Sequence, residues 1–341
     1  MEAPSNESHQ EVLGDFTKFV DGATVLVVTV SYKSAGLVIN SLATLEREAQ
    51  DVPGLRVAVV DNTCGTDAAE IRAAIRERGW EHFAMLLVSP KNGGYAYGNN
   101  VAVRAALKAR SAPKYFWLLN PDAQACPGAT RALVDHLDQN PKIGIAGSQL
   151  LNPDGSVWPY AFRFPTLISE FERGARLGIL TKALQRYVAV RQMGERPEQV
   201  DWLPGASMLI RRAVFEDVGL MDEGYFLYHE ETDFCLQAQK AGWECWYLPS
   251  SRVMHIAGQS TGVTNRDGRP KRRPEYVFDS RRRFFVKNHG WPYAVMADLA
   301  WSFGFASWRV RLRLQRRTDP DPPHLLWDSL RHSALVRGRR I

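Results

Sequence analysis

Between Val25 and Gln149, short apolar runs alternate with segments long enough to form helices. Each apolar run is bounded by turn residues, which is typical of strands, and the stretches between the runs have the pattern of helices. Alternating strands and helices predict a mostly parallel, Rossmann-like sheet with helices on both faces, so the fold class is α/β. The predicted strands are VLVVTVS, LRVAVVD, FAMLLVS, YFWLLN and IGIAGSQ, and the predicted helices lie near residues 35–49, 67–78, 98–110 and 128–139.

The residues that follow these strands are the first candidates for binding, because ligands of parallel sheets lie beyond the carboxyl ends of the strands. The first such turn, SYKSAG, lacks the glycine patterns of dinucleotide-binding and P-loop proteins, which argues against an NAD enzyme or an ATPase. Asp61 ends the second strand, where its carboxylate either accepts a hydrogen bond from a nucleobase or forms an Asx turn or helix cap. The loop NGGYAYGNN lets the backbone approach a ligand closely, or is a plain tight connection.

The run FWLLNPDA places Asn120 and Asp122 on either side of Pro121 at the end of a strand. Hard oxygen ligands of this kind hold Mg²⁺ or Mn²⁺ against a diphosphate, although a proline turn with an aspartate helix cap gives the same pattern. His255 follows a later predicted strand and is either a structural residue or a second ligand of the metal at Asp122.

Three carboxylates occur within four residues in the second half of the chain: Glu230, Glu231 and Asp233 follow the sequence FLYH. They begin a predicted helix that ends near Ala241 and is closed by Gly242, and the positive end of a helix favours one or two acids. Glu230 and Asp233 would share a helix face, while Glu231 points about 100° away. Because a carboxylate aimed at a hydroxyl can act as a general base, this cluster is the candidate catalytic site.

Positive charge gathers at the C-terminal end. Residues 264–341 hold 18 Lys and Arg against 7 Asp and Glu, although the net charge of the whole chain is only +6. Charge alone does not distinguish nucleic acid, anionic lipid and a phosphate-bearing substrate. Six aromatic residues precede the arginines and predict either a helix that lies in a membrane interface or an ordinary helix packed on the catalytic domain. They are Trp291, Tyr293, Trp301, Phe303, Phe305 and Trp308.

The four cysteines show neither CxxC spacing nor a regular framework, so the sequence predicts no zinc site and no disulfide scaffold. The first 20 residues lack the pattern of a signal peptide, and the apolar run TVLVVTVSY is too short to span a membrane. We therefore expect a cytoplasmic protein, with any lipid contact at the inner face of the cell membrane.

Seven motifs, taken in order, resemble those of the family 2 inverting glycosyltransferases, especially the bacterial rhamnosyltransferase-like branch of cell-surface polysaccharide assembly. The resemblance covers about residues 25–262 and extends weakly through RRRFFVKNHG. It implies the GT-A fold, in which a nucleotide-binding half precedes an acceptor-binding half. The motifs are VTVSYKSAG, VVDNTCGTD, NGGYAYGNN, LLNPDA, WLPGASMLIRRAVFEDVG, HEETDFCLQAQKAGW and VMHIAGQST.

The resemblance assigns roles to the residues that match these motifs. Asp122 and His255 would hold Mg²⁺ or Mn²⁺ on the diphosphate of the donor. Glu231 takes the position of the catalytic base, and Glu230 and Asp233 would orient it or bind acceptor hydroxyls. The residues assigned to the nucleotide are Tyr32, Asp61, Asn92, Gly94, Asn99, Asn120 and Asp122, and those assigned to the acceptor are Trp202, Gly205 and Ala206.

Two positions depart from the family pattern. Asn120-Pro121-Asp122 stands where many relatives carry Asp-x-Asp, so an amide replaces one carboxylate and we expect weaker metal binding. Glu230-Glu231 stands in place of the usual Glu-Asp pair, so the candidate base lies one methylene further from the backbone.

The resemblance implies a chain of three parts. We expect a flexible N-terminus (1–22), a GT-A domain (23–262) and a basic, aromatic helical extension (263–341). The GT-A domain comprises a nucleotide-binding half (23–150) and an acceptor-binding half (151–262), in which residues 163–200 form a helical insertion.

The expected reaction is transfer of a sugar, L-rhamnose from dTDP-L-rhamnose, to a hydroxyl of a glycan or lipid-linked saccharide, with inversion. Transfer from a UDP-hexose or UDP-galactofuranose is the alternative within the class. A sugar nucleotidyltransferase would carry a glycine-rich, basic first loop, which SYKSAG is not. A non-catalytic membrane-surface or nucleic-acid-binding protein would depend on the basic extension, and of these partners nucleic acid is not favoured. The sequence does not indicate an oligomeric state.

Overall fold

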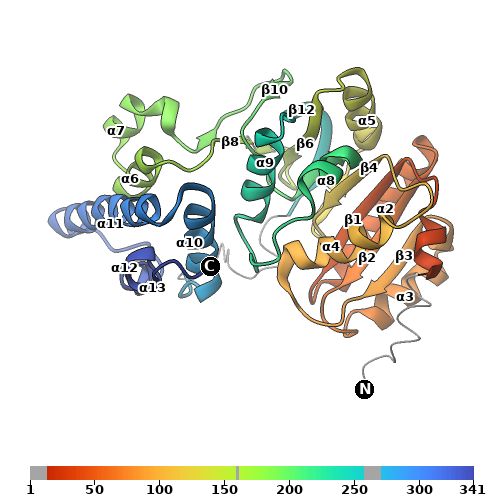
Figure 1. Cartoon of the computed structure of the whole chain (residues 1–341), viewed down its shortest axis with the longest axis horizontal. Coiled ribbons are helices and arrows are strands. Elements are labelled where there is room, and N and C mark those ends of the chain that lie inside the picture. The colour runs from red at the N-terminus through yellow and green to blue at the C-terminus, as the bar shows by residue number, and fades with distance from the viewer. Residues whose placement is uncertain (1–13, 159–160, 257–269) are drawn as a thin grey trace.

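The computed structural model describes residues 14–158, 161–256 and 270–341. A curved sheet flanked by helices fills one side of the molecule, and a group of helices from the C-terminal region fills the other (Figure 1). Most of the expected N-terminal segment (1–22), the end of the VMHIAGQST motif and the expected boundary between 262 and 263 lie outside the described residues.

Within the described residues ten strands form the central sheet, in the order β10-β12-β6-β11-β4-β1-β2-β3, with β5 paired to β12 and β7 to β6. The five strands predicted from the sequence are β1, β2, β3, β4 and β6, and β4, β1, β2 and β3 are parallel neighbours. Strand β11 runs antiparallel between β4 and β6, so the sheet is mixed. The strands are β1 (Val25–Ser31), β2 (Leu55–Asp61), β3 (Ala84–Val88), β4 (Tyr115–Leu119), β5 (Ala123–Ala125), β6 (Ile143–Leu151), β7 (Val157–Trp158), β10 (Glu198–Gln199), β11 (Ser207–Arg211) and β12 (Glu244–His255).

The order of the strands marks the place for a ligand. From β1 the chain adds β2 and β3 on one side of the sheet, and it then returns to add β4 on the other side of β1. Ligands of open parallel sheets bind in the crevice that such a reversal leaves at the carboxyl ends of the strands. Tyr32, directly after β1, and Asn120, directly after β4, therefore flank the expected crevice.

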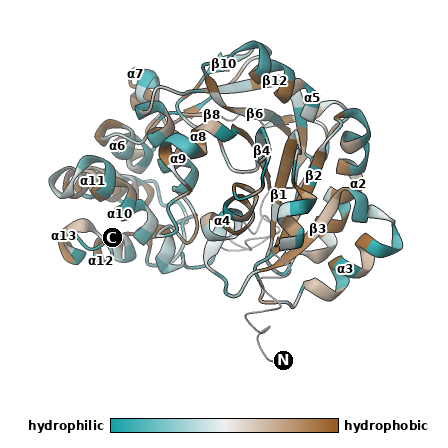
Figure 2. Cartoon of the chain, turned by 45° about the vertical axis from the view of Figure 1, so that its right-hand side comes forward, coloured by the Kyte–Doolittle hydropathy of each residue, from teal (hydrophilic) through white to brown (hydrophobic). Residues whose placement is uncertain are grey.

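Helices cover both faces of the sheet, as predicted. All seven residues of β1 are buried, which is the pattern of a strand enclosed on both sides. Val25 and Val27 belong to one apolar cluster, and Leu26 and Val28 to the cluster on the opposite face. Hydrophobic strands lie inside more polar outer helices in Figure 2. The first helices are α2 (Ala35–Asp51), α3 (Ala68–Glu77), α4 (Gly94–Ala106) and α5 (Ala129–Gln139), with the 3₁₀ turn η1 (Trp80–His82); α4 begins four residues earlier than predicted.

The second half of the chain adds the insertion and the acidic helix. The sequence NPDGS forms a hairpin turn between β6 and β7, where Asn152 N–H donates to Ser156 O at 2.8 Å. The helix predicted from Glu230 is α9 (Glu230–Lys240). The other elements here are β8 (Ala161–Phe162), α6 (Leu167–Ala175), α7 (Gly178–Ala183), η2 (Gln185–Tyr187), β9 (Val190–Arg191) and α8 (Arg212–Val218).

The C-terminal helices pack on the insertion. Helix α11 crosses α6 so closely that a Cβ atom at Gly174 would lie 2.5 Å from Trp301 O, and one at Gly304 would lie 2.5 Å from Phe171 O. The insertion therefore supports these helices, a role that its sequence did not suggest. No helix among the described residues is long and apolar enough to cross a membrane. The C-terminal helices are α10 (Glu275–His289), α11 (Trp291–Leu314), α12 (Leu325–Arg331) and α13 (Ala334–Arg337).

Candidate active site

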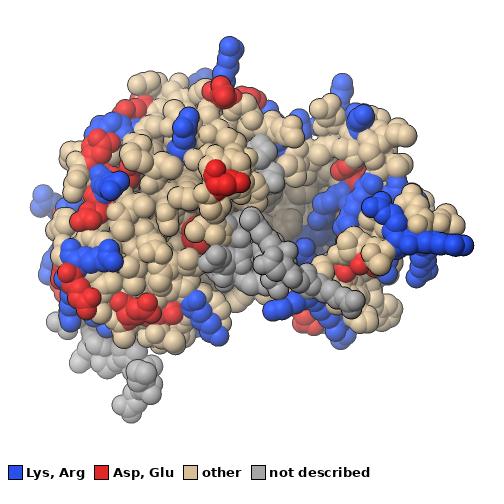
Figure 3. All heavy atoms as spheres, turned by 180° about the vertical axis from the view of Figure 1, so that it is seen from behind, with Lys and Arg blue, Asp and Glu red and all other residues tan. Residues whose placement is uncertain are grey.

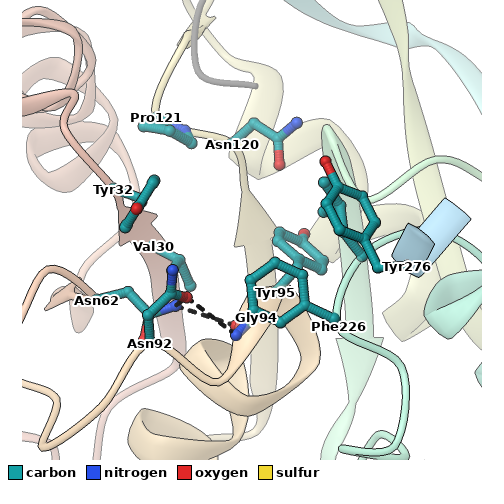
Figure 4. A pocket seen from close by; sticks show the side chains of 11 residues that line it. Val30, Tyr32, Asn62, Asn92, Gly94, Tyr95, Asn120, Pro121, Phe226 and Tyr276 are labelled. Carbon is teal, nitrogen blue, oxygen red and sulfur yellow. Dashed lines mark hydrogen bonds between the residues drawn. The ribbon is translucent and has the colours of Figure 1, made fainter. Parts of the chain in front are cut away.

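A cavity of about 310 Å³ opens at the carboxyl ends of β1, β2 and β4. Tyr32, Asn62 and Asn120 line its sheet side, and Phe226 and Tyr276 face them from the other side (Figure 4). The cavity thus lies where the strand order predicts a ligand, with polar amides on one side and apolar rings on the other. Its lining residues are Val30, Tyr32, Asn62, Asn92, Gly94, Tyr95, Asn120, Pro121, Phe226, Leu227 and Tyr276.

The amides on the sheet side are held in place by hydrogen bonds. Asn62 Nδ2 donates to Asn92 Oδ1 at 3.0 Å and to Gly94 O at 3.1 Å, and Gly94 N–H donates to Asn92 Oδ1 at 3.1 Å. Gly94 has a φ of +87°, and a Cβ there would lie 1.8 Å from Phe226 O. Only glycine accepts this backbone and this contact, so the two sides of the cavity meet at Gly94.

Two residues assigned to the nucleotide lie behind the cavity wall. Asp61 is fully buried, and its Oδ1 accepts hydrogen bonds from the backbone N–H and the hydroxyl of Thr63, which is the Asx turn that the sequence left open. Asn99 lies inside α4, and its amide donates to Tyr95 O at 3.0 Å. Neither side chain lines the cavity. Asp61 and Asn99 lie next to the wall residues Asn62 and Tyr95, and Asp61 Oδ2 and Asn99 Oδ1 make no hydrogen bond within the described residues, so their roles toward a nucleotide stay predictions.

Asp122 and His255 lie together at the far end of β4. Strand β5 pairs with β12 so that His255 stands opposite Ala123, and His255 Nε2 comes within 3.2 Å of Asp122 Oδ1. Both side chains are buried, and neither Asp122 Oδ1 nor His255 Nδ1 makes a well-aligned hydrogen bond within the described residues. A carboxylate oxygen and an imidazole nitrogen so placed fit a hard divalent cation whose other ligands are water and diphosphate oxygens. Within the described ranges no third acidic, histidine or cysteine side chain completes a metal-binding group.

A short chain of hydrogen bonds links the cavity to the acidic helix. Tyr95 lines the cavity, and its hydroxyl donates to Gly205 O at 2.8 Å. Gly205 N–H in turn donates to Glu231 Oε1 at 3.1 Å. Burial raises the pKa of Tyr95 well above its usual value, and the negative charges of Glu231 and Glu230 raise it further. Glu231 therefore lies near the edge of the cavity, and Gly205 separates it from the wall residue Tyr95.

Burial raises the pKa of the Glu231 carboxyl above its usual value of 4.5. The pKa of Glu230 is raised further, by its burial first and by the negative charge of Glu231 second. A raised pKa makes a carboxylate a stronger base, and a general base works best when its pKa approaches the working pH. Burial thus gives Glu231 the raised pKa that suits a general base, and Glu230 is its buried acidic neighbour.

The segment that leads into the pair has an unusual backbone. Tyr228 and His229 have φ angles of 71° and 70°, two consecutive left-handed residues that are not glycine. Each such residue costs about 1–2 kcal/mol, and strain of this kind concentrates at functional sites. The two residues turn the chain so that α9 begins with Glu230 buried and Glu231 at the Gly205 loop.

Asp233, the third candidate catalytic acid, bonds to a neighbouring helix. Its Oδ2 accepts a hydrogen bond from Lys287 Nζ at 2.6 Å, and its Oδ1 accepts one from Asn288 Nδ2 at 2.7 Å. Both donors belong to α10. Asp233 is buried in this contact, and both of its oxygens bond to α10, so it fastens α9 to the C-terminal helices.

Helix α10 contributes to the cavity itself, which the sequence did not reveal. Tyr276 lines the wall and packs against Phe226, with ring centroids 5.2 Å apart. Ser280 Oγ donates to Leu227 O at 2.9 Å and fixes the neighbouring wall residue. The basic extension is thus part of the site. Its aromatic and serine residues carry no local motif, so only the three-dimensional contact identifies them.

The three residues assigned to the acceptor have different surroundings. Gly205 contacts both Tyr95 and Glu231, and Ala206 O accepts a hydrogen bond from Asn120 N–H at 3.2 Å. Trp202 stacks on Phe162 with ring centroids 4.3 Å apart and a 15° tilt. Gly205 and Ala206 therefore join the acidic helix to the end of β4, whereas Trp202 packs on Phe162 and donates to Arg163 O at the start of the insertion.

A family model described as glycosyltransferase like family 2 matches residues 22–272, most of the chain. The chain belongs to this family. It is a glycosyltransferase, and the order of its sheet and the cavity at the strand ends agree with the GT-A fold that its motifs predict.

Several similar proteins are named as rhamnosyltransferases. An N-acetylglucosaminyl-diphospho-decaprenol L-rhamnosyltransferase of Mycobacterium tuberculosis is 32% identical over 247 residues, which cover 69% of this chain and 77% of that protein. Rhamnosyltransferase WbbL of Escherichia coli K12 is 28% identical over 183 residues, 52% of this chain and 66% of that protein. A mannosyltransferase from Pyrobaculum calidifontis, solved with GDP-Man and Mn²⁺, has a TM-score of 0.51 at 14% identity and covers 98% of this chain and 91% of its own. This structure shows the shared fold alone.

Proposed function

We propose that this family 2 glycosyltransferase moves L-rhamnose from dTDP-L-rhamnose to a hydroxyl of a glycan or lipid-linked saccharide in cell-surface polysaccharide assembly. The observation that carries the proposal is the position of Glu231, held by Gly205 one residue beyond a nucleotide-sized cavity. The names of the relatives support rhamnose and a lipid-linked acceptor. A place at the inner face of the cell membrane, with contact through residues 263–341, belongs to the same proposal.

In the proposed reaction Glu231 removes the proton of the acceptor hydroxyl. The freed electron pair of that oxygen forms a bond to the anomeric carbon, on the face opposite the diphosphate. The bond from that carbon to the diphosphate oxygen breaks, and the nucleoside diphosphate leaves with the electron pair. One displacement inverts the anomeric configuration, and Glu231 ends with the proton.

A divalent cation at Asp122 and His255 would neutralise the charge that develops on the leaving diphosphate. The roles of the other residues are positional. Asn62 and Asn92 present fixed amide groups to the nucleoside, and Tyr95 holds the Gly205 loop against Glu231. Glu230 lies beside Glu231, and burial and the negative charge of Glu231 raise the pKa of Glu230.

The apolar side of the cavity favours a deoxyhexose over the alternative UDP-hexose or UDP-galactofuranose. Phe226, Leu227 and Tyr276 form that side and offer carbon surface to a sugar. The methyl group of rhamnose loses no hydrogen bond against such a surface, whereas the hydroxymethyl group of a hexose does. An apolar pocket rejects an added hydroxyl by a factor of about 10² at most, so the donor must be measured.

The test is a panel of nucleotide sugars, assayed for thermal stabilisation and for turnover with Mg²⁺, Mn²⁺ and a chelator. We expect dTDP-L-rhamnose to raise Tm because a ligand of the folded state stabilises it, and we expect chelation to reduce the shift. Stabilisation by UDP-sugars alone would transfer the proposal to the alternative donor. No response to any nucleotide sugar would remove the cavity as the donor site.

A further inference from the structure

Helix α11 has two unlike faces. Its inner face packs on the other helices, and Trp301 and Phe305, two of the aromatics that the sequence suggested for a membrane interface, are buried there. Tyr293 also packs in the core, and of the six predicted residues only Phe303 is strongly exposed. The remaining exposed apolar side chains of α11 were not among those predicted. The exposed set is Met296 (48%), Leu299 (51%), Phe303 (71%), Val310 (54%) and Leu314 (78%).

These five residues form one line on the helix. At 100° per residue they fall within about 60° of its circumference, and they span about 27 Å along its axis. We call this line the α11 stripe. Ten of the eighteen large apolar side chains that are exposed in the described residues lie between 296 and 341. Exposed apolar surface is thus concentrated at the helical end of the molecule, and such concentration marks an interaction surface.

Positive charge adjoins the α11 stripe at its C-terminal end. Arg313, Arg316 and Arg317 are exposed, and none of them pairs with a carboxylate of the described residues. The single acid of α11, Asp298, is buried and bonded to Arg281. Lys and Arg gather over the helical end of the molecule in Figure 3. The stripe therefore presents apolar side chains together with uncompensated positive charge, and no negative charge.

We propose that the α11 stripe docks on an anionic phospholipid surface. Phe303 and Leu314 enter the boundary between headgroups and acyl chains, and the neighbouring arginines bind headgroup phosphates. Binding of this kind increases with the buried apolar area and with attraction to anionic lipid, to which each basic residue near the surface adds about 1 kcal/mol. The inference deepens the proposed function, because it states where a lipid-linked acceptor would meet the enzyme.

A second copy of the chain fits the stripe less well. Two antiparallel stripes would set the arginines of one copy against the N-terminal part of the other, where Met296 and Leu299 offer no carboxylate. The charges would then lose water without gaining a partner, which is costly. Lipid phosphates supply the negative charge that a second copy lacks.

Flotation of the full chain with vesicles tests the proposal without donor or acceptor, so its outcome is independent of the proposed reaction. We expect the wild type to float with vesicles of phosphatidylcholine and phosphatidylglycerol and to float less with phosphatidylcholine alone. Phe303→Glu and Leu314→Glu should each reduce the bound fraction about tenfold or more, because each removes a large side chain from the interface. Arg313→Glu with Arg317→Glu should remove the preference for anionic vesicles.

Val157→Glu is the matched control, because Val157 is 45% exposed on β7, outside the helical region. It should float like the wild type, and all variants should keep the wild-type Tm because the substituted residues are exposed. Equal flotation of Phe303→Glu and the wild type overturns the proposal, as does a wild type that binds neither vesicle. A dimer in sedimentation that Phe303→Glu separates would assign the stripe to a second copy instead.

Discussion

The first turn of α9 carries acidic residues on two sides of the helix. They lie two residues apart in the sequence, but their surroundings differ. On the cavity side, Glu231 accepts one hydrogen bond from Gly205, and burial raises its pKa. On the α10 side, Asp233 is bonded to Lys287 and Asn288. One carboxylate is thus left with a raised pKa near the cavity, while the other is bonded to a cation and holds two helices together. The partners of an acid decide whether it does chemistry or holds the fold.

The largest effect is expected from Glu231→Gln, which should reduce kcat by about 10²–10⁴-fold because an amide cannot take the acceptor proton. Its affinity for the donor, measured by calorimetry, should change little. Asp233→Asn is the matched control from the same helical turn, and it should retain most of its kcat. Loss of turnover in Asp233→Asn with a folded protein, or retention in Glu231→Gln, would reverse the assignment of the two sides.

A second substitution tests the α10 side through stability. Lys287→Met removes the cation from buried Asp233 and from Asp222, and it should lower the free energy of unfolding by about 3 kcal/mol, the lower end for a broken buried pair. Urea titration measures the change. Lys18→Met is the control, because its pair with Asp15 is 3.4 Å long and exposed at both side chains, and it should cost less than about 1 kcal/mol. Similar losses of unfolding free energy in the two variants would mean that the contacts of Lys287 stabilise the fold no more than an exposed ion pair does.

Tyr276 belongs to α10 yet lines the cavity, so it connects the two sides. Tyr276→Ala should raise the KM for the donor about tenfold, because it removes apolar contact area from the wall. Tyr276→Leu keeps most of that area and should keep most of the affinity. Steady-state kinetics with varied donor separates the two. An unchanged KM in Tyr276→Ala would remove the C-terminal helix from the donor site.

The smallest effect concerns the pH dependence of stability at Glu230. Its pKa is raised in the folded state, so the folded protein binds the proton more tightly than the unfolded chain, and stability falls as pH rises from 4.5 through the raised pKa. Glu230→Gln removes this loss. Its Tm should exceed that of the wild type at pH 8, and the difference should shrink toward pH 4.

Glu223→Gln supplies a control of opposite sign for that measurement. Burial raises the pKa of Glu223, but hydrogen bonds from Arg104 and Asn100 outweigh burial and lower it overall. Its carboxylate therefore stabilises the fold above its usual pKa, and the amide should lower Tm at pH 8. If both amide variants shift Tm in the same direction, the charge of Glu230 is not the cause.

The sequence predicted what depends on local pattern. Five strands of the sheet, the four crossover helices apart from the start of α4, and the beginning of α9 follow from apolar spacing and turn residues. The predicted strand ends place Tyr32, Asn92 and Asn120 around one cavity. The packing of the folded chain shows which side chains already have hydrogen-bond partners, and the sequence pattern does not. Asp61 ends a strand, and Thr63 bonds to its Oδ1 while Oδ2 has no hydrogen-bond partner within the described residues, so a ligand role for Asp61 stays a prediction.

Contacts between distant parts of the chain explain the remaining differences. Lys287 lies 54 residues after Asp233, and Tyr276 lies beyond the segment outside the described residues, so neither contact leaves a local signal near the acids. The sequence also did not predict which face of α11 is buried, because that face packs on residues distant in the sequence. Its aromatic residues do not show which of them face α6, and the close crossing at Gly174 and Gly304 decides this.

The contact at Gly94 sets a rule for redesigning the enzyme. Tyr95 N–H donates to Phe226 O at 2.9 Å. Any side chain at residue 94 would push apart the two backbone segments that this hydrogen bond joins. A mutant library that seeks a new donor sugar should therefore randomise Phe226, Leu227 and Tyr276, which meet the cavity through their side chains, and leave residue 94 unaltered. A substitution at Gly94 would move the cavity wall and the acidic helix together. A screen could then not separate a change of donor selectivity from a loss of activity.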